Sequence, residues 1–71
     1  MPSARVEEFR RVATKLGFSK ARQTGSHERW KHPDGRATTI PIHGGQTIGA
    51  PLFFKILSQL GLDQVQFERL R

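Results

Sequence analysis

The stretch S-H-E-R-W-K-H-P-D-G-R-A-T-T-I-P-I, residues 26–42, decides the fold because it reads as two strands around a tight turn. Pro33-Asp34-Gly35 supplies the turn: proline presets φ, aspartate accepts a local hydrogen bond, and glycine takes a positive φ. The sequence therefore predicts a β-hairpin in which residues 26–32 pair with residues 36–42.

The register of this hairpin follows if His32 and Arg36 flank the turn. The opposed pairs are then Trp30 with Thr38, Glu28 with Ile40, and His27 with Pro41. Side chains alternate between the two faces of a strand. One face can cover a core and carries Trp30, Thr38, Ile40 and Ile42. The other face is basic and open, and it carries His27, Arg29, Lys31, Ala37 and Thr39.

A third strand is expected before the hairpin. Thr24-Gly25 turns the chain, and residues 18–23 precede it with Lys20 and Arg22 on one of their faces. These three segments predict a three-stranded antiparallel sheet with one apolar side.

Helical periodicity flanks the sheet on both sides. One helix places Val6, Phe9, Ala13 and Leu16 on one face, with Ser3 as its N-cap and Gly17 as the residue that ends it. After Gly44-Gly45, a second helix starts at Pro51, ends at Gly61, and has an apolar stripe of Leu52, Phe53, Ile56, Leu57 and Leu60. Asp63 and Gln66 form a capping box for a short last helix over residues 64–70, with Leu62 and Phe67 as its hydrophobic staple. The order of elements predicts an α+β fold.

The length of 71 residues allows one domain, residues 1–71, with a small core, so we expect any site at the surface rather than in a deep pocket. The absence of cysteine excludes a disulfide framework, a thiolate zinc site and a thiol nucleophile. No apolar run approaches the roughly 20 residues that span a bilayer. The N-terminus also lacks the apolar segment of a signal peptide, so a cytoplasmic protein is expected.

The net charge of +6 is the first functional signal. Residues 1–36 hold nine of the 12 basic groups and four of the six acidic groups, whereas residues 37–71 are nearly neutral. A small basic domain with its charge gathered in one half favours a polyanionic partner, usually nucleic acid.

The histidines are the side chains that exchange protons near neutral pH. His27 lies on the basic open face beside Arg29 and Lys31. The same register places His43 diagonal to it, roughly 7–8 Å away, so that a phosphodiester fits between the two rings. His32 faces the opposite way, beside the turn, and reads as a residue without catalytic duty.

The sequence lacks the residue combinations that other kinds of functional site require. His27 and His43 lack a carboxylate on their face, because Glu28 points the other way, so we expect no metal. Ser26 and His27 point to opposite faces and make no nucleophile–base pair. Paired carboxylates are missing, and the glycines match no phosphate-binding loop. Trp30 and most of the phenylalanines read as core rather than as base-stacking residues.

Several segments together resemble the HicA family of bacterial and archaeal toxins. They are K-L-G-F (15–18), R-Q-T-G-S-H-E-R-W (22–30), H-P-D-G-R (32–36), I-P-I-H-G-G (40–45) and I-L-S-Q-L-G-L (56–62). They follow in order over nearly the whole chain, and G-S-H followed by an aromatic residue and H-P-D-G-R is the most specific part. Gly49-Ala50-Pro51 departs from the Lys-Pro-Gly that relatives more often carry.

The resemblance implies a fold like that of double-stranded-RNA-binding domains, α-β-β-β-α, with helices on one face of the sheet. It also implies an mRNA-cleaving toxin, an endoribonuclease neutralised by a cognate HicB-like antitoxin. The catalytic histidine of the G-S-H motif corresponds to His27. We expect a monomer alone and a hetero-oligomer with the antitoxin.

A single histidine suffices for RNA cleavage because the 2′-OH is an internal nucleophile. His27 then contributes ~10²–10⁴-fold as general acid or base, without a metal or other cofactor. His43 is a candidate for the second acid/base role or for positioning the substrate. The expected RNA-binding residues are Lys20, Arg22, Ser26, Arg29, Lys31 and Arg36.

Two other functions stay open at this point. A non-catalytic double-stranded-RNA-binding domain has the same fold and charge, and it differs only in lacking cleavage that depends on His27. A protein-binding adaptor uses the basic face for an acidic partner and neither protects nor cuts RNA.

Overall fold

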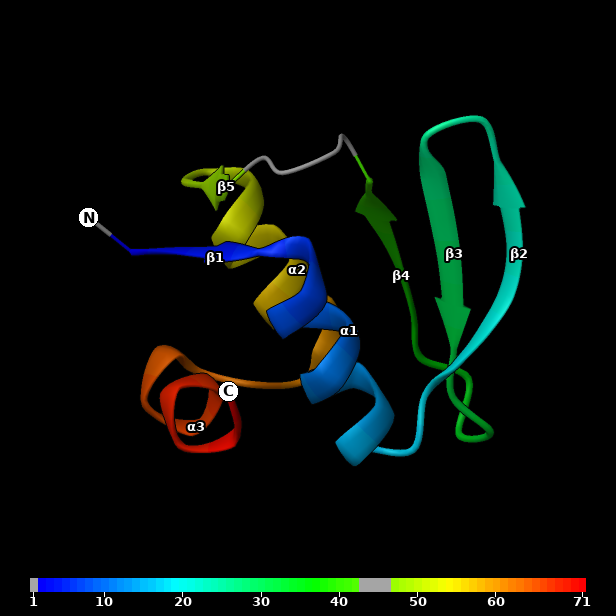
Figure 1. Ribbon diagram of the computed structural model, residues 1–71. Helices are drawn as coiled ribbons and strands as arrows, with labels where there is room; N and C mark the ends of the chain where they lie inside the picture. The colour runs from blue at the N-terminus through cyan, green and yellow to red at the C-terminus, as the bar shows by residue number, and fades with distance from the viewer. Residues whose placement is uncertain (1, 43–46) are drawn as a thin grey trace.

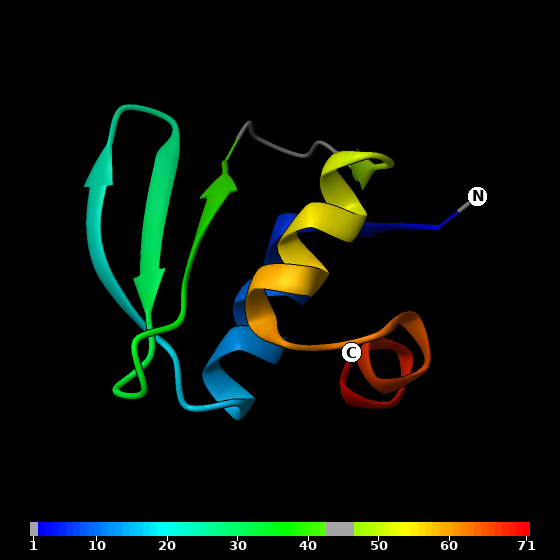
Figure 2. The same ribbon diagram turned by 180° about the vertical axis from the view of Figure 1, so that it is seen from behind.

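The computed structural model describes residues 2–42 and 47–71. Its elements are β1 (Ser3–Arg5), α1 (Val6–Lys15), β2 (Ser19–Thr24), β3 (His27–Lys31), β4 (Ala37–Pro41), β5 (Thr47–Gly49), α2 (Leu52–Leu60) and α3 (Gln64–Leu70). Strands β2, β3 and β4 form an antiparallel sheet, and Figures 1 and 2 show α1 and α2 on one side of it. The arrangement confirms the predicted α+β fold, which is consistent with that of double-stranded-RNA-binding domains.

The hairpin of β3 and β4 has the predicted register. His27 pairs with Pro41, Glu28 with Ile40 and Trp30 with Thr38. At the turn, the His32 N–H donates to the Arg36 carbonyl (2.8 Å), and the Arg36 N–H donates to Asp34 Oδ1 (2.9 Å). Gly35 has φ +100°, in the left-handed region that favours glycine. Local turn chemistry therefore sets the register.

The helix-facing side of the sheet is buried, as the alternation predicts. Trp30, Thr38 and Ile40 are 8%, 0% and 0% exposed. They join a core in which Phe9 of α1, Phe53 of α2 and Phe67 of α3 pack against one another, with ring centroids 5.2–5.8 Å apart. These phenylalanines, like Phe18, are core residues, as the sequence predicts.

Glu28 is a carboxylate buried inside this apolar layer, only 2% exposed. Arg10 of α1 donates to both of its oxygens (3.0 and 2.6 Å), and the Trp30 indole N–H donates to Oε1 (3.1 Å). Lys20 Nζ lies 3.8 Å from Oε2. The hydrogen bonds from Arg10 hold the pKa of the Glu28 carboxyl below its usual value. The hydrogen bonds between Arg10 and Glu28 therefore join α1 to β3, and they pair the buried charge of the carboxylate.

The expected placement of Lys20 and Arg22 on one face of β2 is wrong. Lys20 pairs with Trp30 and Arg22 pairs with Arg29, so two residues of β2 advance where β3 advances one. This β-bulge at Ala21 turns Lys20 to the helix side, towards Glu28, and leaves Arg22 on the open side.

The expected N-cap at Ser3 is also wrong. Ser3 lies in β1, which pairs with β5 and brings Ala4 opposite Ile48. Both side chains are buried in the core. The helix begins at Val6, with the Arg5 N–H donating to the Glu8 carboxylate (3.0 Å). Neither β1 nor β5 was expected, because their pairing joins segments more than 40 residues apart.

The other helix ends match the sequence. Gly17 and Gly61 have φ +95° and +82°, and Asp63 and Gln66 form the expected capping box. One member of the predicted apolar stripe of α2 differs: Leu52 is 37% exposed and does not join the core. The predicted break at Gly44-Gly45 lies outside the described residues.

We predict that Glu28→Gln lowers the free energy of unfolding at pH 7 by about 2 kcal/mol, because it removes the charge that Arg10 and Trp30 bind. The folded pKa of Glu28 lies below its unfolded value of about 4.3. Its stabilising contribution is therefore complete above that value and lost as pH falls through the folded pKa. Urea denaturation followed by circular dichroism at pH 7, 4 and 3 measures both effects.

The control is Glu7→Gln, which removes an exposed carboxyl from the same helix that carries Arg10. We expect it to change the unfolding free energy by about 0.5 kcal/mol or less. Equal midpoints for the two variants at pH 7 contradict the structural role of Glu28.

Candidate active site

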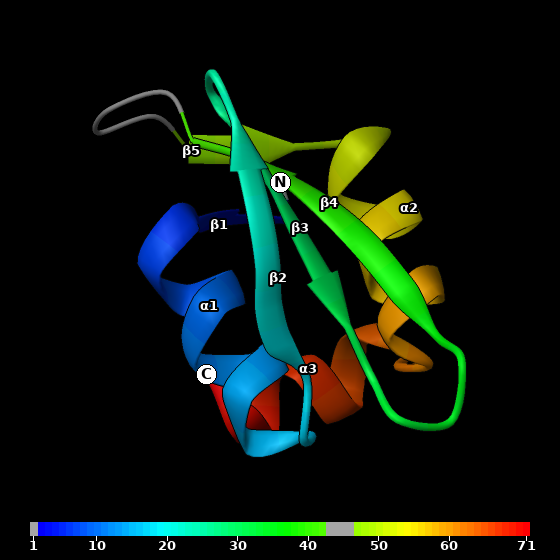
Figure 3. The same ribbon diagram turned by 90° about the vertical axis from the view of Figure 1, so that its right-hand side faces the viewer.

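Figure 3 looks onto the sheet with β2, β3 and β4 in front of the helices. The open face of the sheet carries three cross-strand rows of residues. They are Ser19–Lys31–Ala37, Arg22–Arg29–Thr39 and Thr24–His27–Pro41. These positions of the sheet carry one histidine, three cations and no carboxylate. The bulge at Ala21 is what adds Arg22 to the row of Arg29.

The pairs between β3 and β4 on this face are the closely spaced ones of an antiparallel ladder. His32 and Arg36 form a backbone-bonded pair, as do Ser26 and Ile42, whose N–H donates to the Ser26 carbonyl (2.7 Å). By alternation, His27–Pro41 and Arg29–Thr39 are non-hydrogen-bonded pairs, in which side chains lie closer together. Pro41 therefore costs the ladder no bond.

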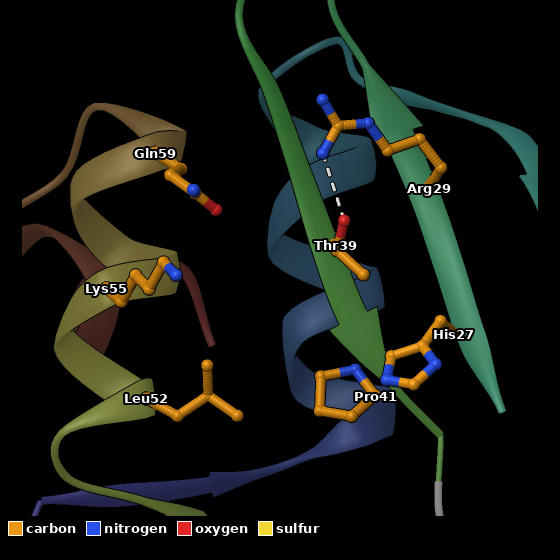
Figure 4. Close-up of a pocket in the computed structure, with 7 residues that line it drawn as sticks. All are labelled: His27, Arg29, Thr39, Pro41, Leu52, Lys55 and Gln59. Carbon is orange, nitrogen blue, oxygen red and sulfur yellow. Dashed lines mark hydrogen bonds between the residues drawn. The ribbon is translucent and has the colours of Figure 1, made fainter.

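This close spacing fixes Arg29. Its Nη1 donates to Thr39 Oγ1 (2.9 Å), so a neutral hydroxyl from the next strand holds one edge of the guanidinium. The remaining N–H groups point along the open face (Figure 4). A half-buried, oriented guanidinium is a suitable partner for a phosphate.

His27 is exposed at the first position of β3, immediately after a two-residue turn. Gly25 opens that turn with φ +58°, a left-handed conformation that type I′ and II′ hairpins require at their first central position. Ser26 is the second turn residue and is half-buried. The turn places the imidazole at the end of the sheet, across from Pro41.

A groove of about 360 Å³ lies at the edge of the sheet, where β4 runs beside α2, and residues of the open face and of α2 line it together. It is lined by His27, Arg29, Thr39, Pro41, Leu52, Lys55 and Gln59 (Figure 4). One wall comes from the sheet and the other from one side of α2. The imidazole, one guanidinium and one ammonium group therefore share a single open hollow.

The wall from α2 was missed by sequence reasoning. Leu52, Lys55 and Gln59 are spaced three and four residues apart, so they share a helix face, and this spacing was the available signal. Lys55 reads as an ordinary solvent-facing lysine unless the packing of α2 beside β4 is known. Gln59 is held by the buried Thr38 hydroxyl, which donates to its Oε1 (2.7 Å).

Of the six expected RNA-binding residues, Arg29 is the one that lines the groove. Arg22 and Lys31 lie elsewhere on the open face, and Ser26 lies in the turn before β3.

The other two expected RNA-binding residues contact protein groups. Lys20 faces Glu28 on the helix side. Arg36 donates to the Leu60 carbonyl (2.7 Å) and to the Asp34 carboxylate (2.7 Å), and its guanidinium lies 5.2 Å from the centre of the Phe18 ring. These contacts join the turn to the end of α2.

The other two histidines are His32, which contacts protein groups, and His43. The Nε2 of His32 bonds to the Leu16 carbonyl (3.1 Å), and its Nδ1 accepts from the Asp34 N–H (3.0 Å). The His32 ring also packs against Phe18. These contacts give His32 a structural role beside the turn, which the sequence did not predict. His43 lies outside the described residues, and its place near His27 stays a prediction.

The described residues around His27 form no cluster of metal-ligating side chains. Within residues 2–42 and 47–71, no three His, Asp or Glu side chains gather as metal ligands. The carboxylate next to His27 in sequence, Glu28, is buried on the other face with Arg10 as its partner.

The fold and groove define a small α+β domain that displays a histidine and cations on the open face of a sheet. A family model described as "HicA toxin of bacterial toxin-antitoxin" matches residues 6–62, from the start of α1 to the residue before Asp63. The chain belongs to this family of toxins, which act within toxin–antitoxin systems and so have an antitoxin partner. A search of curated proteins found no match. No helix in the described part of the chain is both long and apolar enough to cross a membrane.

The contacts of Arg36 and Arg29 predict that substitution of Arg36 lowers the stability of the fold more than substitution of Arg29. Arg36→Gln loses the bond to the Leu60 carbonyl and the contact with Phe18, so we expect the unfolding free energy to fall by about 1 kcal/mol. Arg29→Gln loses one bond on the open face, and we expect a change of about 0.5 kcal/mol or less. Thermal unfolding measures the change for both variants. A larger loss of unfolding free energy for Arg29→Gln than for Arg36→Gln contradicts this prediction.

Proposed function

We propose that this toxin is a metal-independent endoribonuclease that cleaves mRNA, with His27 as its catalytic residue. The observation that carries the proposal is an exposed imidazole in the same groove as Arg29 and Lys55, on a sheet face without carboxylates. Such a face attracts a polyanion and tolerates the further negative charge that develops during phosphodiester cleavage.

RNA supplies its own nucleophile, so the protein needs no serine, cysteine or metal-bound water. The 2′-oxygen attacks the adjacent phosphorus, and His27 takes the 2′-OH proton. The bond from phosphorus to the 5′-oxygen breaks, and that oxygen gains a proton from water or a second acid. The products are a 2′,3′-cyclic phosphate and a 5′-hydroxyl. A positioned general base contributes about 10²–10⁴-fold to such a reaction.

Arg29 is the residue best placed to stabilise the phosphorane. Thr39 orients its guanidinium, and the two residues line the same groove as His27. A pre-oriented cation stabilises developing charge without reorganising. Arg22 and Lys31, in the neighbouring positions of the open face, hold flanking phosphates. Lys20 and Arg36 have no part in this proposal because their side chains bind protein groups.

His43 stays the candidate from sequence for the second acid/base role or for positioning the substrate. The antitoxin is proposed to be a HicB-like protein that covers the open face with acidic or bulky groups. Ser26, in the turn before His27, stays a proposed RNA-binding residue, and its carbonyl accepts a hydrogen bond from the Ile42 N–H (2.7 Å).

We predict that His27→Ala reduces RNA cleavage by at least about 10²-fold and abolishes toxicity, because the general base is lost. The side chain is exposed, so the unfolding free energy changes by about 0.5 kcal/mol or less. Gel analysis of a defined RNA incubated with purified protein in EDTA measures cleavage, and circular dichroism confirms the fold.

A matched RNA with a 2′-deoxy nucleotide at the cleaved position is the substrate control and should resist the wild-type protein. Full cleavage by His27→Ala sinks the assignment of His27. RNA binding with a strong salt dependence but no cleavage by the wild-type protein favours the non-catalytic RNA-binding domain instead.

A further inference from the structure

The groove has a second wall, on α2, whose residues take no step in the proposed cleavage reaction. Leu52, Lys55 and Gln59 of α2 face His27 and Arg29 across the open hollow (Figure 4). The reaction itself requires only a base, a cation and the substrate's own 2′-OH. The question is what these three side chains bind.

Gln59 is oriented rather than free. The Thr38 hydroxyl is 0% exposed and donates to Gln59 Oε1 at 2.7 Å. Because Thr38 engages the carbonyl oxygen of the amide, the NH₂ group of Gln59 is the part that can donate to a ligand in the groove. A fixed amide donor in a solvent-filled hollow matches an acceptor on the edge of a nucleobase.

Leu52 and Pro41 give the same groove an apolar component. Leu52 is 37% exposed, although its position on α2 predicts burial, and it lines the hollow together with Pro41. Apolar surface beside an oriented donor fits the face and edge of a single base. In a duplex the Watson–Crick edges are already paired, so only an unpaired base can fill such a site.

Lys55 supplies the charge of this wall. It is exposed on α2, one helical turn from both Leu52 and Gln59, and lines the groove opposite the sheet cations. An ammonium on a flexible stem binds a phosphate without demanding one geometry. A nucleotide seated here presents its phosphate to Lys55 and its base to Gln59.

We propose that the α2 wall is a nucleotide-binding subsite for single-stranded RNA, in which Lys55 binds a phosphate next to the scissile one and Gln59 reads the adjoining base. Thr38 acts as a positioning residue for Gln59. The inference rests on the proposed nuclease function, which makes RNA the ligand. It adds that this RNA is single-stranded and that Gln59 gives the site a base preference.

Binding of four short homopolymeric 2′-O-methyl oligonucleotides, of A, C, G and U, tests the subsite with the wild-type chain. The methyl group removes the nucleophile but leaves bases and phosphates, so affinity is measured without cleavage. Fluorescence anisotropy at several salt concentrations gives the affinity and its salt slope.

For Lys55→Gln we expect about fivefold weaker binding of all four oligonucleotides and a salt slope smaller by about 0.7. Lys55→Arg restores both. The matched control is Arg69→Gln, which removes one positive charge from α3, outside the groove. Equal effects of Lys55→Gln and Arg69→Gln overturn the phosphate contact.

For Gln59→Ala we expect the ratio between the best-bound and the other oligonucleotides to change by about fivefold, with the salt slope unchanged. Thr38→Val keeps the side-chain shape and removes the hydroxyl, so it should produce the same change in the ratio. Gln64→Ala in α3 is the control. A uniform loss of affinity for all four, or an unchanged ratio, overturns base reading by Gln59.

These outcomes separate the subsite from the nuclease. If the wild-type protein binds the oligonucleotides with a base preference but leaves unmodified RNA intact, the subsite is supported and the catalytic proposal is wrong. Cleavage that depends on His27 but is indifferent to Lys55 and Gln59 removes the subsite alone. If the wild-type protein binds none of the oligonucleotides, the α2 wall is not an RNA-binding subsite.

Discussion

The pairing of the buried Glu28 carboxylate with Arg10 is the interaction on which the orientation of the sheet depends. Arg10 and Trp30 donate to its oxygens inside the core, so the charge is paired where an unpaired one would be costly. Since neighbouring strand residues point to opposite faces, anchoring Glu28 inward turns His27 and Arg29 outward. The same contact removes an acid from beside the imidazole and leaves the open face positive.

A chain of 71 residues has little core to give up, and its candidate site is an open groove rather than an enclosed pocket. The groove forms where the edge of a sheet meets a helix, using side chains that the core does not need. RNA is a suitable substrate for so open a site, because the 2′-OH and the phosphate lie on the substrate itself. Membership of the HicA toxin family implies an antitoxin partner, and the open face is where we propose that this partner binds.

Sequence reasoning succeeded where the deciding interactions are local. The register of β3 and β4 follows from Pro33-Asp34-Gly35, and the capping box follows from Asp63 and Gln66, each within a few residues. It failed where a distant partner decides. The bulge at Ala21 exists only in the pairing of β2 with β3, and β1 forms only because β5 lies beside it. A strict period of two therefore placed Lys20 on the wrong face.

By itself, the sequence determined the α+β class, the hairpin register and the outward position of His27 and Arg29, because alternation and turn chemistry act along the chain. Tertiary structure alone decided that Lys55 and Gln59 stand across from His27, and that Arg36 braces the end of α2. The physical reason is that a groove belongs to two elements at once. Its width and lining depend on how α2 packs against β4, and that packing is settled by the whole core rather than by any one segment.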